Sequence, residues 1–434
     1  MTLYCHNDID ATEALYRTLR EPLLLRSALG RRYDLDLRSR SDAQVGEAIV
    51  TRRVERAVGH RLARPQATGQ GSFAYEPPSF LRFEEPCLAA LLERLRETRF
   101  RVGSGARVET PALLKKLLLP IGKGVYSMGI GGLHSTEAHR ALHADGEHAL
   151  IDVDVASQYP NIILKLGLYP AAVGSTFLDV YADLVRERLA AKAAGDRVAA
   201  EGGKIAANGI FGKLGSPHSI LYAPHLMLAV TLTGQLAVVM LIERAERAGI
   251  PVVSANTDGV VFRCPRARED DLDALLRAWE DETGFAIERT RYSAFYSSSV
   301  NTYLAIREDG KVKRKGWIAD PWTEGDLRGQ LMKNPQMTIV AEAAVSYLRD
   351  GFPIEDTVCG CDDPRRFLTV IKVASGARWR GAYLGRVVRY YWSLDGDPIL
   401  TAAGGRVSRT EGARPLGELT DAVPPDLDRL RYCE

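Results

Sequence analysis

The stretch Pro251-Val-Val-Ser-Ala-Asn-Thr-Asp-Gly-Val-Val-Phe262 decides how the chain is organised. Its two β-rich arms, Val252-Val253 and Val260-Val261-Phe262, flank the turn-forming residues Asn256-Thr-Asp-Gly259. Two such arms around a short turn indicate a β-hairpin. We therefore expect Asp258 to present its carboxylate near the tip of a hairpin.

Helical and strand patterns surround this hairpin. A long apolar helix is expected from about 225 to 248, ending at Gly249, and a strong strand from 149 to 155. Between them, residues 177–194 and about 204–212 have helical spacing, and glycines punctuate the connection. This predicts a short antiparallel pair of helices. Other helical patterns cover 8–38, 42–62, 87–95, 112–119 and 337–349, and an Arg-rich and aromatic segment covers 378–392.

Composition limits the class of protein. The 434 residues, 46% of them apolar, suffice for two to four compact units with a buried core. With 57 basic and 55 acidic residues the net charge is +2, so affinity for phosphate must come from local clusters. Six scattered cysteines without a CxxC pair indicate free thiols in a reducing compartment. We find no 18-residue apolar run and no signal peptide, and therefore expect a cytoplasmic protein without membrane contact.

Three short signatures occur in order along the chain. They are Asp154-Val-Ala-Ser-Gln-Tyr-Pro160, Lys204-Ile-Ala-Ala-Asn-Gly-Ile-Phe-Gly212 and Asn256-Thr-Asp-Gly259. Together they resemble polymerase motifs A, B and C of phage-type family B DNA polymerases, and the resemblance is clearest from 126 to 316. It implies an α+β fold with right-hand architecture and a template-directed enzyme that adds dNMP to a primer 3′ end.

The resemblance also implies a division into domains. A palm with an antiparallel sheet would occupy 120–164 and 213–318, short helical fingers 165–212 and a thumb 319–434. Residues 41–119 would form a connecting helical region. Residues 1–40 would be the remnant of an exonuclease domain, because Tyr4-Cys-His-Asn-Asp8 resembles the third exonuclease motif, Y-x-x-x-D.

Carboxylates in the first and third signatures suit nucleotidyl transfer. This reaction uses two divalent cations about 3.5–4 Å apart, held by carboxylates that can bridge them. We expect Asp154 and Asp258 to hold two Mg²⁺ ions, or Mn²⁺, and assign Val155 to the same metal site. Asp152 lies on the same strand face as Asp154 and is a secondary candidate. Asn256 stands where the family usually has a second carboxylate. The alternative interpretation of Asp154 and Asp258 is that each is an ordinary turn-forming aspartate.

The nucleotide site follows from the resemblance and from helical spacing. Tyr159 resembles the family's steric gate, which excludes a 2′-hydroxyl and selects dNTPs. Arg188 and Lys192 are i and i+4 on one expected helix, as are Lys204 and Asn208 on the next. The resemblance assigns the cations to the triphosphate and Lys204 to proton donation toward pyrophosphate. A solvated charged face is the alternative for these cations. The expected nucleotide-binding set is Ser157, Tyr159, Arg188, Lys192, Lys204 and Asn208.

DNA contacts are expected at two further segments. The segment from Tyr126 to Gly132, with Gly131 and Gly132, resembles the family's Y-x-GG region, where backbone lies close to template phosphate. Tyr303, Lys313 and Lys315 lie where relatives hold primer phosphates, which gives affinity rather than sequence choice. A plain loop and a solvated charge run are the respective alternatives.

Expectations about partners complete the reading. Primer-template DNA and dNTPs are the expected substrates. The earlier exonuclease motifs cannot precede Met1, so the chain alone should not proofread, and a separately encoded exonuclease half or replisome proteins could join it. The short distances between motifs argue against terminal-protein priming. The expected setting is a phage-infected or plasmid- or prophage-bearing bacterium. The competing hypothesis is a catalytically silent primer-template-binding fragment.

Overall fold

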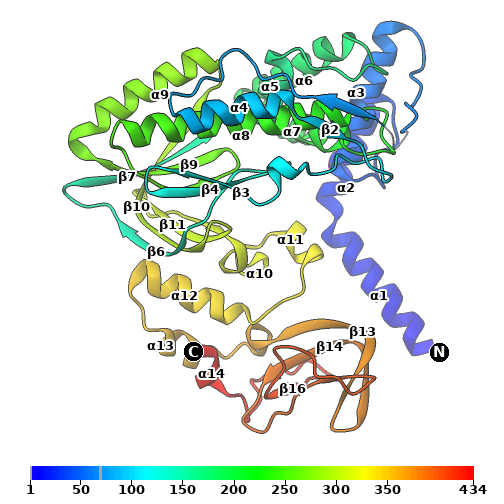
Figure 1. Cartoon of the computed structure of the whole chain (residues 1–434). Helices are drawn as coiled ribbons and strands as arrows, with labels where there is room; N and C mark the ends of the chain where they lie inside the picture. Colours follow the sequence, from blue (N-terminus) through cyan, green and yellow to red (C-terminus); the bar gives the residue numbers. More distant parts are fainter. Residues whose placement is uncertain (1, 68–70) are drawn as a thin grey trace. The chain divides into compact units, whose positions relative to one another are not determined.

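The computed structural model describes residues 2–67 and 71–434, and the chain divides into two compact units (Figure 1). Unit 1 comprises Met1–Thr136 and Gly146–Thr290. Unit 2 comprises Glu137–Asp145 and Arg291–Glu434. Met1 and residues 68–70, which fall in the expected exonuclease remnant and connecting region, lie outside the described residues.

Unit 1 contains an antiparallel sheet built around the hairpin quoted above. The hairpin is confirmed, because β8 pairs with β9 with Asn256 opposite Gly259. The strand expected to end at Val155 is also confirmed as β7, which pairs with β9 along its whole length. Antiparallel strands with separate helices confirm the α+β class. The strand order is β7-β9-β8-β5-β4-β3, with β3 Leu117–Ile121, β4 Gly124–Met128, β5 His134–Ser135, β7 His148–Val155, β8 Val252–Asn256 and β9 Gly259–Pro265.

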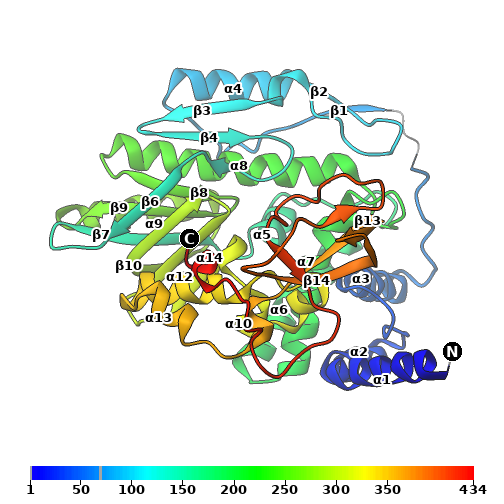
Figure 2. The same ribbon diagram turned by 90° about the horizontal axis from the view of Figure 1, so that it is seen from below.

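The long helix α8 (Pro224–Arg247) forms the centre of the core of unit 1. It lies against the sheet, with α4 (Pro86–Glu97) and α9 (Glu269–Thr283) near it (Figures 1 and 2). Trp279 donates its indole N–H to the Ala237 carbonyl at 3.0 Å, and the Tyr75 and Thr233 hydroxyls lie 2.8 Å apart. No 18-residue apolar run was expected, yet α8 is long and apolar enough to cross a membrane. However, 83% of its most apolar window is buried, as in a core helix.

Two antiparallel helices confirm the expected helical pair. They are α6 (Thr176–Ala193) and α7 (Arg197–Leu214), and Tyr181 donates to the Ala207 carbonyl at 3.0 Å between them. Helix α7 begins seven residues before the expected Lys204, because the Asp196 side chain caps it by accepting from the Ala199 N–H at 3.0 Å. Helix α3 (Asp42–Val58) packs on this pair, so close that a methyl group on Gly46 would meet the Ala206 carbonyl at 2.8 Å.

The N-terminal pattern forms two helices, α1 (Thr2–Thr18) and α2 (Arg20–Tyr33), instead of one. Ile9 and Tyr16 on α1 are 63% and 64% exposed. In contrast, Leu29 on α2 is buried and packs closely on Gly202 of α7. A methyl group on Gly202 would lie only 2.5 Å from the Leu29 side chain. Helix α2 is therefore part of the core of unit 1, whereas Ile9 and Tyr16 of α1 face solvent.

The helix expected over 112–119 is wrong. A single 3₁₀ turn, Ala112–Leu114, is followed by strand β3. Side chains in β3 alternate, with Leu118 54% exposed and Leu119 buried, and Pro120 is tolerated because β3 lies at the sheet edge. Short apolar runs fit either a strand or a helix, and here the pairing with β4 decides. The remaining elements of unit 1 are α5 (Gln158–Lys165) and the two-stranded sheet of β1 (Ser72–Ala74) and β2 (Arg99–Arg101).

Unit 2 contains two antiparallel groups of strands. The first has the order β12-β11-β10-β6, with β6 Ala138–His143, β10 Ile287–Ser299, β11 Thr302–Arg307 and β12 Val312–Lys315. The second has the order β15-β13-β14-β16, with β13 Thr369–Trp379, β14 Ala382–Trp392, β15 Leu400–Thr401 and β16 Ala413–Pro415. In β14, Tyr390 and Tyr391 are buried while Arg386 faces solvent, so aromatics of this segment form core.

Helices of unit 2 include α12 (Thr338–Asp350), which confirms the amphipathic pattern over 337–349. The others are α10 (Pro321–Glu324), α11 (Leu327–Met332), α13 (Ile354–Cys359) and α14 (Arg429–Cys433), with 3₁₀ turns at Arg266–Arg268 in unit 1 and at Gly316–Ile318 and Pro364–Phe367 in unit 2.

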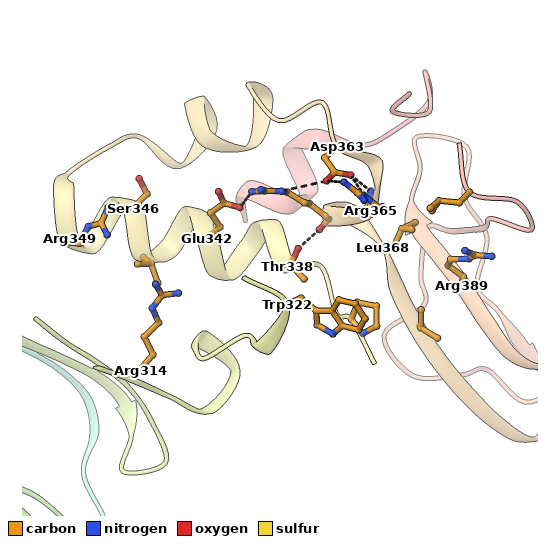
Figure 3. A pocket seen from close by; sticks show the side chains of 15 residues that line it. Arg314, Trp322, Thr338, Glu342, Ser346, Arg349, Asp363, Arg365, Leu368 and Arg389 are labelled. Carbon is orange, nitrogen blue, oxygen red and sulfur yellow. Dashed lines mark hydrogen bonds and ion pairs between the residues drawn. The ribbon is translucent and has the colours of Figure 1, made fainter. Parts of the chain in front are cut away.

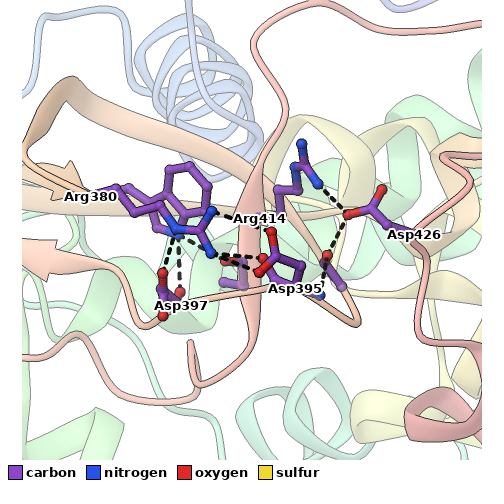
Figure 4. A network of polar contacts seen from close by, with 8 residues as sticks. Arg380, Asp395, Asp397, Arg414 and Asp426 are labelled. Atoms are coloured by element: carbon purple, nitrogen blue, oxygen red, sulfur yellow. Dashed lines mark hydrogen bonds and ion pairs between the residues drawn. The ribbon is translucent and has the colours of Figure 1, made fainter.

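Polar contacts fasten the loops of unit 2 to its second sheet (Figure 4). Arg380, at the β13–β14 turn, pairs with Asp395 at 3.1 Å and with Asp397. Asp426 accepts from the Tyr391 hydroxyl at 2.9 Å and from Arg414 at 2.6 Å. These pairs lie on the surface and act as structural clamps on the loops.

Candidate active site

Asp154 and Asp258 lie side by side at one end of the sheet of unit 1. In the β7–β9 register Asp154 is opposite Gly259, and the Val155 N–H donates to the Asp258 carbonyl at 3.0 Å. A methyl group on Gly259 would lie 3.5 Å from Asp154 Oδ2. The strand pairing therefore brings the two predicted carboxylates to the same edge.

The hairpin tip that carries Asp258 has a constrained backbone. Thr257 adopts a left-handed conformation with φ of 61°, which costs energy for a β-branched residue. Its N–H donates to the Leu133 carbonyl at 2.7 Å, and the Asp258 N–H donates to the Asn256 carbonyl at 2.8 Å. These bonds fix the direction in which Asp258 leaves the turn.

The glycine segment before β5 packs directly against this tip. A methyl group on Gly132 would lie 2.6 Å from Thr257 Oγ1, whereas one on Gly131 would meet no atom within 4 Å. Tyr126, the third residue expected to contact DNA, lies in β4 with a side chain only 1% exposed. Within unit 1, Gly132 thus leaves room for the Thr257 side chain, and Tyr126 belongs to the core.

A pocket of about 280 Å³ opens beside the two carboxylates. The residues that line it come from the end of β7, from α5, α6 and α7, and from the hairpin tip. The lining includes seven of the predicted site residues. It is formed by Asp154, Val155, Ser157, Gln158, Tyr159, Pro160, Arg188, Ala207, Asn208, Phe211 and Asp258.

Tyr159 forms one wall of this pocket. Its ring lies on that of Phe211 with 4.1 Å between centroids and 31° between planes. Burial raises the pKa of the Tyr159 hydroxyl, and the negative charge of Asp258 raises it further. The hydroxyl therefore stays protonated, and the ring is held as an apolar surface near the carboxylates.

The turn between β7 and α5 is what aims Tyr159 into the pocket. Ser157 has φ of 48° and an exposed side chain. Gln158 is buried and donates to the Gly234 carbonyl of α8 at 3.4 Å, while Asn161 donates to the Ala156 carbonyl at 2.8 Å. Sequence reasoning missed Gln158, although a polar residue between Ser157 and Tyr159 in the first signature was the available signal.

The four helical residues expected to bind the nucleotide are only partly brought together. Arg188 and Asn208 line the pocket. Gly203 leaves room for Arg188, because a methyl group on Gly203 would lie 2.7 Å from the Cβ of Arg188. Lys192 and Lys204 are not among the lining residues. Both are exposed, and Lys204 lies 3.9 Å from Glu201 on its own helix.

The donor set at the sheet edge suits a hard divalent cation. Asp154 and Asp258 offer carboxylate oxygens, and Val155 lines the same pocket. Among the described residues no group of three or more His, Cys, Asp or Glu side chains is arranged to hold a metal. Two carboxylates fit Mg²⁺, which keeps several waters and uses one or two carboxylates together with substrate phosphates.

The remaining predicted residues lie in unit 2 or on α1. Tyr303 on β11 is opposite Lys315 on β12, and its ring lies 5.4 Å from that of Phe295. Lys313 is exposed on β12. Asp8 of the exonuclease-like motif is exposed on α1, and the side chain of Tyr4 lies outside the described residues.

Comparisons with known proteins find DNA polymerases among the similar proteins. No family model matches the chain. DNA polymerase 2 of Aeropyrum pernix is 26% identical over 157 residues, 34% of this chain and 19% of the relative. DNA polymerase 1 of Sulfolobus acidocaldarius is 27% identical over 119 residues, 27% of this chain and 13% of the relative. The matches therefore span less than a fifth of the length of these relatives.

A solved structure, that of the family B DNA polymerase from Pyrobaculum calidifontis, covers 99% of this chain and 54% of its own with a TM-score of 0.47 and 16% identity. The sequence matches to the two archaeal DNA polymerases confirm the resemblance to DNA polymerases that the three motifs predicted. Their archaeal origin gives no support to the phage or bacterial setting expected from the sequence.

Proposed function

We propose that this chain is the nucleotidyl-transfer portion of a template-directed DNA polymerase that adds dNMP to a primer 3′ end. The observation that carries the proposal is one pocket lined by Asp154, Asp258 and Tyr159. Two adjacent carboxylates beside a fixed aromatic ring are what a two-metal phosphoryl transfer with sugar selection needs. The similarity to archaeal DNA polymerases supports the same reaction.

The pocket residues divide the work of binding. Asp154, Asp258 and the Val155 backbone would hold two Mg²⁺ ions, which when bound neutralise phosphate charge and activate the primer hydroxyl. Arg188 would receive the triphosphate, because guanidinium groups bind phosphate oxygens in pairs. Asn208 lies one turn from Lys204 on α7 and would orient the nucleotide.

Tyr159 would select the sugar. Its ring is held by Phe211 and cannot move away without losing that contact, so a ribose 2′-hydroxyl above it would collide. Lys192 and Lys204 would reach the triphosphate only by a movement of α6 and α7 toward the pocket, since neither lines it in this conformation. Lys204 would then be placed to protonate pyrophosphate.

Lys313, Lys315 and Tyr303 of unit 2 would hold primer-template DNA. Two lysines on one hairpin strand present charge along a line, which suits a phosphate backbone and gives no sequence preference. Primer-template DNA and dNTPs are therefore the proposed substrates.

Primer extension tests the proposal. The purified chain is given primed template, Mg²⁺ and dNTPs, beside Asp258→Asn and the control Asp281→Asn, which alters an exposed carboxylate on α9. We expect the wild type and the control to extend and Asp258→Asn to lose at least about 10³-fold in rate. Binding of primed DNA without extension by the wild type would instead favour the silent fragment, in which Asn256 leaves the metal site short of a carboxylate.

A further inference from the structure

Unit 2 contains a larger cavity than the one at the carboxylates, and nothing above assigns it a role. Its volume is about 830 Å³, within the range of ligand pockets. It is enclosed by α12, the end of β12, the α10 turn, the 3₁₀ turn before β13 and parts of β13 and β14 (Figure 3). All of these elements belong to unit 2.

The walls of this cavity combine positive charge with apolar surface. Five arginines and two carboxylates line it, so the formal charge of the lining is three positive. The apolar surface between them is provided by Pro335, Val345, Leu368, Val370 and Leu419. The arginines are Arg314, Arg349, Arg365, Arg366 and Arg389, and the carboxylates are Glu342 and Asp363.

The two carboxylates organise two of these arginines, and Arg349 pairs with its neighbour Asp350. Asp363 holds Arg365 through two bonds of 2.7 and 2.8 Å, and Glu342 pairs with Arg366. Arg389 donates to the Gly417 carbonyl at 2.9 Å, which fixes the guanidinium without neutralising it. A fixed cation of this kind suits a phosphate group.

Trp322 adds an aromatic face to the same cavity. It is 45% exposed, although an indole of this size gains much from burial. Asp320 accepts from the backbone N–H of Trp322 at 2.9 Å and holds the turn that presents the ring. Exposed indole beside fixed guanidinium groups is the combination with which proteins bind unpaired bases and their phosphates.

We propose that this cavity binds a nucleotide unit, with its base stacked on Trp322 and its phosphate held by Arg389. The unit comes either from a single strand of nucleic acid or from a free nucleotide, because both offer the same base and phosphate. A base inside a duplex is already stacked on its neighbours, so the ring selects unpaired over paired strands. The proposal does not depend on the transfer reaction at Asp154 and Asp258.

Fluorescence anisotropy of a 5′-labelled dT₁₂ strand in EDTA tests this proposal without any catalysis. We expect Trp322→Ala to weaken the binding constant about tenfold, since one stacked base contributes this much. Arg389→Ala should weaken it and lower the salt dependence by about one counterion. The matched controls are Trp317→Ala, an exposed indole outside the cavity, and Arg386→Ala on the same strand as Arg389; both should bind as the wild type does.

Three outcomes decide the matter, provided that thermal unfolding shows each variant to be folded. Unlabelled dTMP that displaces the strand at millimolar concentration assigns the site to free nucleotides, and failure to displace it assigns the site to strands. Equal losses for Trp317→Ala and Trp322→Ala would overturn the proposal. An equal loss of duplex binding in Trp322→Ala would also overturn it, since stacking requires an unpaired base.

Discussion

The ring of Tyr159 lies on the ring of Phe211, with 4.1 Å between their centroids, and so couples the turn after β7 to helix α7. We predict that Tyr159→Ala lowers the preference for dNTP over NTP by about tenfold or more, because the surface below the sugar is lost. Phe211→Ala should lower it less, since the tyrosine remains but is free to tilt. Incorporation of dNTP and NTP is compared in single-nucleotide assays.

Tyr159→Phe is the matched control for this prediction. The pKa of the Tyr159 hydroxyl is raised by burial and then by Asp258, so at neutral pH the group is uncharged and its removal changes no charge. Discrimination should be preserved. A loss in Tyr159→Phe as large as in Tyr159→Ala would show that the hydroxyl, not the ring, selects the sugar.

Gly132 and Gly131 form a matched pair that tests the support of the hairpin tip. A methyl group on Gly132 would lie 2.6 Å from Thr257 Oγ1, whereas one on Gly131 meets nothing within 4 Å. We predict that Gly132→Ala lowers the free energy of unfolding by about 1–3 kcal/mol and slows primer extension, because overpacking displaces the turn that carries Asp258. Gly131→Ala should change neither.

Chemical denaturation and primer extension measure these two effects. The double variant Gly132→Ala with Thr257→Gly should recover stability, because it removes both the colliding hydroxyl and a strained left-handed threonine. Equal effects of the two alanines would mean that this contact does not position Asp258.

The sequence predicts an element well when interactions between neighbouring residues determine it, and poorly when tertiary packing determines it. The hairpin around Asp258 was predictable because its two arms and its turn are formed by neighbouring residues. The start of α7 was not, because Gly202 and Gly203 have poor helix propensity. Leu29 and Arg188 pack where their methyl groups would be, so the helix needs glycine at these positions, and such a reason is visible only in the tertiary structure.

The candidate site likewise has some residues that local sequence places and others that only tertiary packing places. Asp154, Val155, Ser157 and Tyr159 follow one another in a single turn, so their common place was predictable from the motif. The positions of Lys192 and Lys204 depend on how α6 and α7 are rotated against α3, which the spacing of four residues does not determine. The strands β13 and β14 are not predictable from their sequence, because arginines and aromatics alternate irregularly there and do not give a clear pattern of period two.

Glu47 of α3 and Lys213 at the end of α7 form a half-buried ion pair of 2.7 Å, with side chains 18% and 14% exposed. Burial by itself raises the pKa of Glu47, but hydrogen bonds from Lys213, Ser219 and the Ile220 N–H outweigh it, and the pKa falls below its ordinary value of 4.5. A lowered folded-state pKa stabilises the fold above pH 4.5, and this stabilisation is lost as the pH falls through the lowered value.

We therefore predict that Glu47→Gln lowers the free energy of unfolding by about 1–3 kcal/mol at pH 7. The difference between wild type and variant should narrow as the pH falls below 4.5. Urea unfolding across this range measures it. Glu93→Gln, at an exposed pair with Arg96, is the control and should change little at any pH. If the difference in the free energy of unfolding between wild type and Glu47→Gln does not change with pH, the destabilisation comes from packing and not from the charge of Glu47.

Helix α1 exposes apolar side chains without contributing to the core. Ile9 and Tyr16 are 63% and 64% exposed, and Arg17 pairs with Glu13 on the same helix. We predict that deletion of residues 1–18 changes the melting temperature by less than about 2 °C, because surface groups contribute little to stability. Self-association should decrease, since exposed apolar surface promotes it.

Calorimetry and light scattering at several protein concentrations check this prediction. The full-length variant Ile9→Lys with Tyr16→Lys separates the two effects, because it keeps the helix but removes its apolar surface. It should reduce association as much as the deletion does. A deletion that lowers the melting temperature by more than about 5 °C would mean that α1 supports α2, and through Leu29 the packing against Gly202 of α7.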